Sequence, residues 1–347
     1  MTWITWRQLR AQVLVVYAAL AAVAAALAIT GPQLADLRRT NPADFLVLFP
    51  QDGTYKPLYF VGGAVVYALP VVIGAFWGAP LVARELETGT HRVVWNQSIT
   101  RNRWLATKLG LAGLAALVAG LISLAVTWWC APIDAAVNST EPDGGFFNIT
   151  RMSAVLFGAR GVVPIGYAVL AFVIGVTAGL VLRRTVPAMA ATVVAVVAIQ
   201  VATPLFVVPH LISPERLTTA ITATNLRGMS LSADDDMVTD IRINLDKPGA
   251  WILSNETVNS SGQVVDELPA HEADCAPRTG ELADKASSPG PPASCFEDLA
   301  AAGFQQEVVY QPADRYWLLQ SIQTAILLSL AVLLSGFCFW RIRRDFT

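Results

Sequence analysis

A short segment between residues 84 and 103 holds the densest group of side chains that could do chemistry. It carries both signs of charge, whereas the runs on either side of it are almost uncharged. Val93, Val94, Trp95 and Ile99 are mixed with its polar residues, a pattern typical of a short amphipathic element on a membrane surface or on a partner. The alternative is a solvated loop that only carries positive charge. The charged and titratable residues are Arg84, Glu85, Glu87, His91, Arg92, Arg101 and Arg103.

Familiar catalytic and metal-binding patterns do not occur in the sequence. It contains no Gly-x-x-x-x-Gly-Lys-Ser/Thr for binding ATP, no His-Glu-x-x-His and no Gly-x-Ser-x-Gly. His91, His210 and His271 lie in separate segments, and no two cysteines form a Cys-x-x-Cys pair. We therefore predict that the chain is not an enzyme and holds no metal or cofactor of its own.

The long apolar runs contain only mild polar residues. Their cores hold no Asp, Glu, Lys or His, and Arg160 lies near the edge of one run. Carriers driven by protons or sodium commonly hold ionisable residues at depth, so the sequence argues against ion-coupled transport. Gln320, Gln323 and Thr324 share one helical face by their spacing. We favour hydrogen bonds between helices for these polar residues, with a substrate pathway as the alternative. The set is Gln200, Thr203, Gln320, Gln323 and Thr324.

The composition is that of an integral membrane protein. Of the 347 residues, 54% are hydrophobic and 14% are charged, against about 25% charged in a soluble domain. Six apolar runs are long enough to cross a bilayer, and they must be helical because lipid offers the backbone no partners. The first run is too long for a signal peptide, so we predict an uncleaved helix. The predicted spans are 12–30, 58–83, 105–131, 161–182, 186–208 and 317–340.

The distribution of Lys and Arg predicts the orientation of the spans. With the N-terminus in the cytoplasm, about half of all Lys and Arg lie on the cytoplasmic side, in the termini and in the loops after the second and fourth spans. We therefore predict an all-α multi-pass membrane protein with both termini cytoplasmic and with an α+β domain outside the cell. Residues 1–208 form helices 1–5 with a cytoplasmic segment at 84–104, residues 209–316 form the external domain, and residues 317–347 form helix 6 and a basic cytoplasmic tail.

The region 209–316 has the pattern of a small folded domain. Short alternating runs between turn residues indicate strands, and "CFEDLAAAGF" indicates a short helix that ends at Gly303. Cys275 and Cys295 flank a loop rich in Pro, Ser and Gly. A disulfide is allowed outside the cytoplasm, and closing this loop stabilises by roughly 3 kcal/mol in the chain-entropy model. We predict that these cysteines are paired, with two free thiols as the alternative.

One long stretch resembles a known family. "GAPLVARELETGTHRVVWNQSITRNRWLATKLG" is similar to the segment between the second and third spans of bacterial type-2 ABC exporter permeases. In that family the pattern RE-x-E-x-GT … S-x-T/S-R forms the coupling helix that engages a separate ATPase. "MTWITWRQLRAQ" resembles the family's N-terminal interfacial helix, and the last span with the large domain before it looks like an actinobacterial branch. The matching residues are Arg84, Glu85, Glu87, Gly89, Thr90, Ser98, Thr100 and Arg101.

The resemblance implies the membrane subunit of an ATP-driven exporter in a bacterial plasma membrane. Its partners would be two ATPase subunits, which bind the ATP and Mg²⁺, and a second permease chain in a homodimer. Glu85 and Glu87 would pair with basic residues of the ATPase, and Trp95 would pack in its groove. The apolar spans favour a hydrophobic or amphipathic substrate such as an antibiotic, a peptide or a lipid, as in multidrug efflux. No nucleic-acid partner is implied.

A different class of protein is the rival interpretation. The chain would then be a membrane-anchored sensor or assembly factor whose external domain binds a ligand or a protein. An ATPase encoded beside the gene would favour the exporter, whereas a neighbouring kinase or secreted ligand would favour the sensor. A membrane enzyme is a third interpretation, which the lack of clustered acids, bases and nucleophiles disfavours.

Overall fold

The computed structural model describes residues 2–89, 100–138, 149–231, 237–265, 268–269 and 293–344. Within these residues six helical stretches are long and apolar enough to cross a membrane, which confirms the six predicted spans. Five extend beyond the predicted bounds, because polar residues at their ends remain helical. The stretches are Arg10–Thr40, Tyr55–Glu87, Arg101–Val137, Val163–Leu182, Thr185–His210 and Ala313–Arg344.

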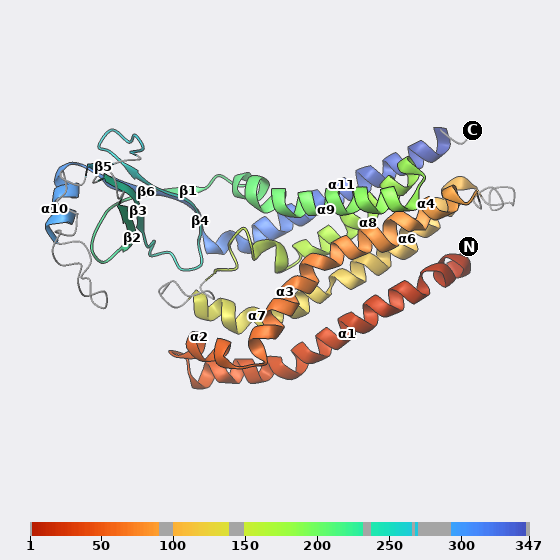
Figure 1. Ribbon diagram of the computed structural model, residues 1–347, viewed down its shortest axis with the longest axis horizontal. Coiled ribbons are helices and arrows are strands. Elements are labelled where there is room, and N and C mark those ends of the chain that lie inside the picture. Colours follow the sequence, from red (N-terminus) through yellow and green to blue (C-terminus); the bar gives the residue numbers. More distant parts are fainter. Residues whose placement is uncertain are drawn as a thin grey trace. The chain divides into compact units, whose positions relative to one another are not determined.

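Most of these stretches combine several helical elements (Figure 1). The first is the single helix α1 (Thr2–Thr40), and the fourth is α8 (Val163–Leu182). The second comprises α3 (Tyr55–Val72), the π-helix η2 (Ile73–Gly78) and α4 (Ala79–Glu87), and the third comprises α6 (Arg101–Gly120) and α7 (Ile122–Val137). The fifth comprises α9 (Thr185–Ala202), η4 (Thr203–Val207) and η5 (Val208–His210), and the sixth comprises η7 (Ala313–Arg315) and α11 (Tyr316–Arg344). Short elements between them are α2 (Phe45–Leu48), η1 (Phe49–Gln51) and η3 (Phe157–Ala159).

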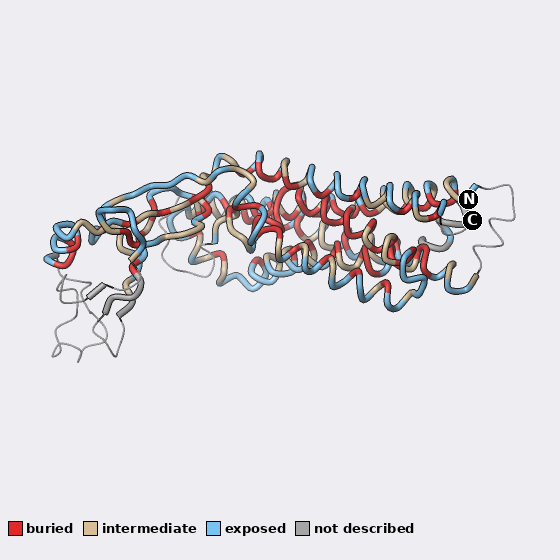
Figure 2. The backbone as a smooth tube through the Cα atoms, turned by 90° about the horizontal axis from the view of Figure 1, so that it is seen from above, coloured by how far each residue is buried: buried red, intermediate tan, exposed pale blue. Residues whose placement is uncertain are grey.

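Helix α8 forms the centre of the membrane unit. Of its most apolar stretch 61% is buried, against 17% for α1 and 22% for the stretches that contain α9 and α11. It packs against α11, α6 and α9 and against the whole second stretch, α3–η2–α4. Residues buried in the unit lie along the inner faces of the helices, with exposed residues outside (Figure 2). Helix α8 therefore packs against elements of four other membrane stretches.

Four glycines bring the second stretch close to α8. Gly74 and Gly78 lie four residues apart in η2, and Gly175 and Gly179 lie four apart in α8. A Cβ built on Gly74 would lie 2.7 Å from the carbonyl oxygen of Ala171, and one on Gly179 would lie 2.6 Å from the carbonyl oxygen of Ala79. Small residues at this spacing let membrane helices approach backbone to backbone.

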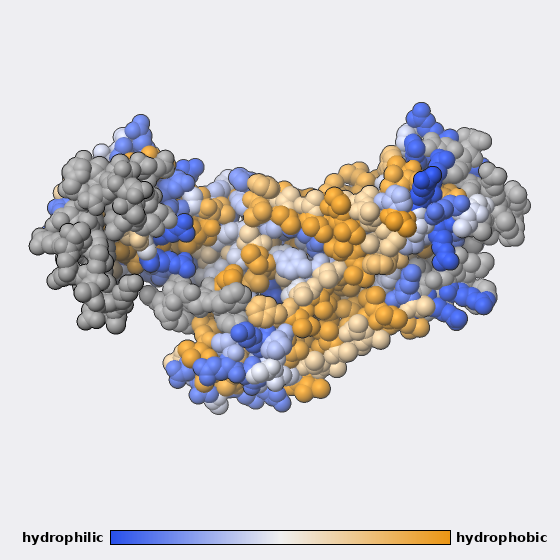
Figure 3. All heavy atoms as spheres, viewed as in Figure 1, coloured by the Kyte–Doolittle hydropathy of each residue, from blue (hydrophilic) through white to orange (hydrophobic). Residues whose placement is uncertain are grey.

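Helix α1 packs along the α6–α7 stretch. The hydroxyl of Tyr17 donates to the carbonyl of Ala115 at 2.8 Å, and the indole of Trp129 donates to the Thr30 hydroxyl at 2.9 Å. Near the end of α1, the Arg38 guanidinium donates to the carbonyl of Pro132. Apolar side chains cover the middle of the helices, and hydrophilic atoms gather near both termini and at the connection from α1 to α3 (Figure 3). This is the surface that a bilayer requires.

A second compact unit is inserted in the chain between η5 and α11, over Ser213–Asp314. Its described residues form two antiparallel three-stranded sheets and one helix, which confirms the predicted strands and helix in this half of the chain. Their orders are β1 (Glu215–Ala220), β6 (Gln305–Gln311), β4 (Trp251–Val258) and β2 (Leu226–Leu231), β3 (Met237–Ile243), β5 (Leu268–Pro269). The helix α10 (Ala293–Ala301) is followed by Gly303, whose φ of 79° places it in the left-handed region that glycine favours.

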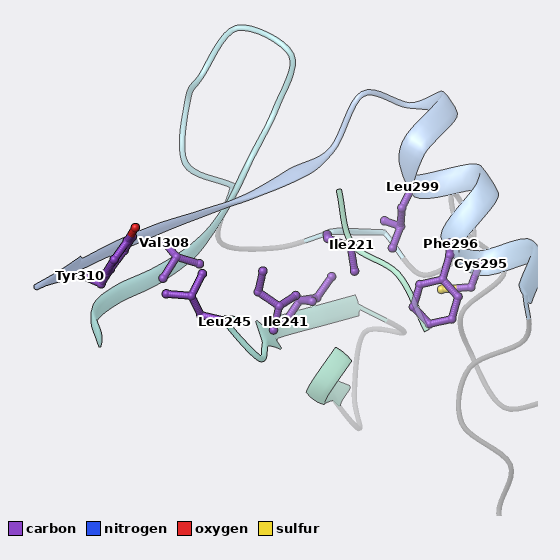
Figure 4. Close-up of a cluster of buried hydrophobic side chains, with 9 residues drawn as sticks. Ile221, Ile241, Leu245, Cys295, Phe296, Leu299, Val308 and Tyr310 are labelled. Atoms are coloured by element: carbon purple, nitrogen blue, oxygen red, sulfur yellow. The ribbon is translucent and has the colours of Figure 1, made fainter. Parts of the chain in front are cut away.

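This unit has a hydrophobic core of its own (Figure 4). Alternate residues of β6 face inward, and Gln306 among them is fully buried. Its amide donates to the carbonyl of Ile241 at 2.7 Å and to Asn255 at 2.8 Å, and its oxygen accepts from Thr257 at 2.9 Å, so no polar atom of Gln306 is left unpaired. The buried core residues are Ile221, Ile241, Ile243, Leu245, Cys295, Phe296, Leu299, Val308 and Tyr310.

The cysteines divide between the two units. Cys130 and Cys338 are free thiols buried among the helices of the membrane unit. Cys295 lies in the core of the inserted unit with no exposed surface. Its predicted partner Cys275 lies outside the described residues, so their pairing stays a prediction.

Candidate functional site

The acidic end of α4 is joined to α6 by a buried ion pair. The Glu85 carboxylate lies 2.6 Å from the ammonium of Lys108, whose side chain is 3% exposed. Glu85 also accepts from the indole of Trp104 at 3.2 Å, and Lys108 donates to the carbonyl of Leu81 at 2.8 Å. The Lys108 ammonium lies 4.7 Å from the centre of the Trp104 ring. We call these contacts the Glu85–Lys108 clamp, and they fix α4 against α6.

Glu87 joins α4 to α9 in a different way. Its carboxylate accepts from the backbone N–H of Thr185 at 2.9 Å and from the Thr185 hydroxyl at 2.7 Å. Thr185 is the first residue of α9, so the carboxylate satisfies an N–H that the helix leaves without a partner. The negative charge of Glu87 also interacts favourably with the positive end of the α9 helix dipole. The last turn of α4 is thus tied to two neighbouring helices.

The rest of the predicted coupling segment is described only at its ends. Arg84 is exposed on α4, and Gly89 has a φ of 71° where the chain leaves the helix. At the other end, Thr100 is the N-cap of α6 and accepts from the N–H of Arg103, and Arg101 is the first residue of that helix. Thr90, Trp95 and Ser98 lie outside the described residues.

The structure changes what is expected of the two glutamates. The sequence predicts that both glutamates bind the ATPase, yet Glu85 already pairs with Lys108 and Glu87 with Thr185 within the chain. Glu85 also lies within the second membrane stretch, which extends to residue 87 rather than ending at residue 83. A role of Glu85 and Glu87 in docking stays a prediction. The structure shows a second role, because both residues join α4 to neighbouring helices.

The three polar residues of the last span contact α8 and the chain before it. The Gln320 oxygen accepts from the N–H groups of Val162 and Val163 at 3.0 and 3.1 Å, and its amide donates to the carbonyl of Phe157 at 2.9 Å. Gln323 donates to the Tyr167 hydroxyl at 2.9 Å. The Thr324 hydroxyl donates within its own helix to the carbonyl of Gln320 at 2.7 Å. Gln320 therefore caps the N-terminus of α8.

The two polar residues of the fifth stretch also have partners within the chain. The Gln200 amide donates to the carbonyl of Tyr67 on α3 at 3.1 Å. The Thr203 hydroxyl donates to the carbonyl of Ile199 one turn earlier at 2.6 Å. Three of the five residues thus form bonds between segments, as the favoured interpretation predicts, and the substrate-pathway alternative stays a prediction.

A second buried ion pair lies at the other end of the α6–α7 stretch. Asp134 is 7% exposed and lies one turn before the end of α7, and Arg160 is 1% exposed and lies just before α8. The Arg160 Nε lies 3.9 Å from the Asp134 carboxylate. The sequence indicated Arg160 at the edge of a span but did not join it to Asp134. The two lie far apart in the chain, and only the contact of α7 with the segment before α8 brings them together.

Among the residues that the structure describes, no group of three His, Cys, Asp or Glu side chains could hold a metal ion. The features that remain are six apolar helical stretches, an acidic helix end tied to two neighbours, and buried pairs near the helix ends. These features define a multi-pass membrane protein.

The chain belongs to the family described as ABC-2 membrane transporter related, whose family model matches residues 17–208. The match runs from within α1 to the first residue of η5 and thus spans most of the first five membrane stretches, including the segment between α4 and α6. It confirms the resemblance to type-2 ABC permeases. The search of curated proteins and the search of solved structures gave no match.

Proposed function

We propose that this chain is the permease of an ATP-driven exporter and that a separate ATPase docks on residues 84–104. The observation that carries the proposal is the position of this segment in a chain of this family. The segment begins at the end of α4, where Glu85 pairs with α6 and Glu87 bonds to α9. A push on the segment would therefore move three membrane helices together. Glu85 and Glu87 form the ties, while Trp95, Thr90 and Ser98 are the candidates for contact with the ATPase.

The proposed orientation places both termini in the cytoplasm. The start of α1 and the end of α11 lie at the same end of the membrane unit (Figure 1), and these helix ends carry Arg7, Arg10, Arg341, Arg343 and Arg344. The inserted unit, Ser213–Asp314, would then face outward. A cysteine placed at exposed Ala223 would react with an impermeant maleimide in intact cells, whereas reaction only after lysis would reverse the orientation.

The proposed assembly contains two permease chains and two ATPase chains, and its substrate is hydrophobic or amphipathic. The exposed faces of α9 and α11 are apolar, which suits lipid or a second copy of the chain. The polar residues of the spans are mostly engaged with one another or with backbone, so the walls of a pathway would be largely apolar. An antibiotic, a peptide or a lipid fits such walls.

The test is capture of an ATPase from native membranes by the full-length chain. Truncating an aromatic anchor of an interface typically costs 2 kcal/mol or more, so Trp95→Ala should weaken capture by at least about tenfold. Trp317→Ala is the matched control, because Trp317 is 53% exposed on α11 and lies outside the proposed docking segment. Arg92→Ala tests whether the segment acts only through its positive charge.

Two results would contradict the proposal. If the wild-type chain brings down no ATPase, the sensor or assembly factor becomes the better interpretation. If Trp95→Ala captures as much ATPase as Trp317→Ala while Arg92→Ala inverts or depletes the protein, residues 84–104 are an ordinary loop that sets orientation.

A further inference from the structure

The chain before α8 is an irregular segment buried among helices and held on both sides. Its residue Gly161 has a φ of 68°. The N–H of Gly161 donates to the Thr127 hydroxyl at 2.8 Å, and its carbonyl accepts from Ser123 at 3.0 Å. Gln320 holds the neighbouring backbone from α11. Buried backbone groups outside regular helices need such partners, so the position of Arg160, next to Gly161, is fixed by α7 and α11.

The guanidinium of Arg160 lacks the hydrogen bonds that its burial requires. Its Nε, Nη1 and Nη2 are all buried, and none has a hydrogen-bond acceptor among the residues that the structure describes. The distance of 3.9 Å to Asp134 allows an ion pair but exceeds a hydrogen bond. The ring of Tyr59 lies 5.4 Å from the guanidinium carbon. A buried cation with unpaired donors is costly unless something supplies acceptors.

More unpaired donors surround the same position. The Tyr316 hydroxyl and the Nε of Arg151 are buried without a hydrogen-bond partner among the described residues. The Arg151 guanidinium lies 4.4 Å from the centre of the Tyr316 ring, and both arginines are within electrostatic reach of Asp134. Among the described residues of this group, two guanidinium groups lie against one carboxylate, which gives the group a net charge of +1. An anion with oxygen acceptors would pair with these donors and balance the positive charge.

We propose that Arg160, Arg151 and Tyr316 form a binding site for an anionic oxygen group, a phosphate or a carboxylate. A guanidinium donates two parallel hydrogen bonds to such a group, in a geometry that a lysine cannot supply. Asp134 competes with the ligand for the same cations. The group could belong to a lipid or to a free solute, since the site lies at helix ends, where a bilayer places its headgroups.

The level of the site follows from the length of the helices. Asp134 lies three residues before the end of α7, and Arg160 lies three residues before the start of α8. The third stretch contains 37 residues, which at 1.5 Å per residue is about 55 Å, against about 30 Å of hydrocarbon. Its end therefore extends into the headgroup region. The site needs no ATPase, so its test is independent of the proposed function.

The test uses the full chain in detergent with two probes, short-chain phosphatidylglycerol and inorganic phosphate, at matched ionic strength. A ligand of the folded state raises the unfolding temperature with its concentration, and diacylglycerol, which has no phosphate, is the control lipid. We expect a saturable response to at least one probe. Saturation by phosphatidylglycerol alone assigns the site to lipid, whereas saturation by phosphate as well assigns it to a soluble anion.

Two variants should change the affinity in opposite directions. Arg160→Gln should weaken binding by about tenfold or more, because it removes a bidentate charged donor. Asp134→Asn should tighten binding, because it removes the competing carboxylate. Arg39→Gln is the matched control and should leave binding unchanged, since Arg39 is an exposed arginine on α1 that pairs only with exposed Asp36 among the described residues. If Arg160→Gln does not fold, Arg151→Gln takes its place and should also weaken binding.

Several outcomes would overturn the proposal. One is the lack of a saturable response to both probes. Another is an equal loss in Arg39→Gln and Arg160→Gln, which would mean general attraction to positive charge. A third is that Arg160→Gln and Asp134→Asn both lower the unfolding temperature without changing the affinity for either probe. In that case the pair is only structural.

Discussion

The two ends of the α6–α7 stretch each carry a buried ion pair, and the two pairs differ in how far their hydrogen bonds are satisfied. Lys108 lies 2.6 Å from Glu85 and also donates to a backbone carbonyl, while Glu85 accepts from an indole. Arg160 lies 3.9 Å from Asp134, and its three nitrogens have no hydrogen-bond acceptor among the described residues. The first pair has the partners that burial demands, and the second does not.

The distance between the pairs explains how a membrane helix can carry both. Asp134 follows Lys108 by 26 residues, which is about 39 Å of helix at 1.5 Å per residue. The hydrocarbon core is about 30 Å thick, so each pair can lie at one of its borders. The comparison teaches that a buried charge near the border of a membrane can either hold two helices together or remain available to a ligand. A charge that holds helices together has its hydrogen bonds satisfied within the chain, whereas a charge available to a ligand does not.

Replacing Gln320 should have the largest effect on this comparison. Gln320→Leu would leave two N–H groups and one carbonyl of the Arg160 segment buried and unpaired. At about 1–3 kcal/mol for each group, the loss of unfolding free energy should be at least about 3 kcal/mol. Anion binding should also fall, because Arg160 is no longer held. The measurements are thermal unfolding in detergent and the phosphate response.

Gln323→Leu is the control for that variant. Gln323 makes one hydrogen bond, to the Tyr167 hydroxyl, and so its replacement should cost about 1–3 kcal/mol and spare anion binding. If both glutamine variants were equally stable, Gln320 would not be what holds the segment.

Breaking the Glu85–Lys108 clamp should have the second largest effect. Glu85→Ala leaves the Lys108 ammonium buried without its carboxylate, and breaking a buried pair in this way typically costs about 3–5 kcal/mol. The double variant Glu85→Leu with Lys108→Met should recover most of that loss, since it removes both charges. Thermal unfolding of the wild type, Glu85→Leu, Lys108→Met and the double variant measures the coupling. Additive losses would show that the pair contributes little.

Much of the membrane unit could be predicted from the sequence. Long uncharged runs specify membrane helices because lipid leaves the backbone no other choice, and the six spans are confirmed. The spacing of Gln320 and Gln323 also indicated one helix face, and the structure shows both side chains bonded to other segments. The helix ends were harder to predict. Residues such as Glu85 and Asp134 read as polar flanks, yet they continue the helices.

The contacts between distant residues could not be predicted. Asp134 and Arg160 pair because α7 packs near the segment before α8, and Glu87 reaches Thr185 because α4 and α9 meet. The glycine pairs of η2 and α8 carried a signal that was missed, since Gly-x-x-x-Gly occurs in both segments. A single sequence shows which helices can pack closely, but it does not show which helix is the partner.

Breaking the link between Glu87 and Thr185 should have the smallest effect on stability. It tests whether the contacts of Glu85 and Glu87, both in the last turn of α4, are independent of each other. Glu87 is exposed and Thr185 is partly exposed, and the carboxylate satisfies only the first turn of α9. Glu87→Gln and Thr185→Ala should therefore barely change the unfolding temperature. They should instead speed amide hydrogen exchange in the first turn of α9, while amides of α6 keep their protection.

Asp36→Asn is the matched control, because it removes an exposed carboxylate of α1 that pairs with exposed Arg39 and holds no helix end. It should leave the exchange of α9 unchanged. If Glu87→Gln lowered the unfolding temperature as much as Glu85→Ala, the two glutamates would form one structural unit. In that case the contrast between a buried clamp and a surface cap at the end of α4 would be wrong, and a partner that displaces Glu87 would also disturb the contact between α4 and α6. If only α9 responds, Glu87 can leave Thr185 for a partner while Glu85 keeps α4 in place.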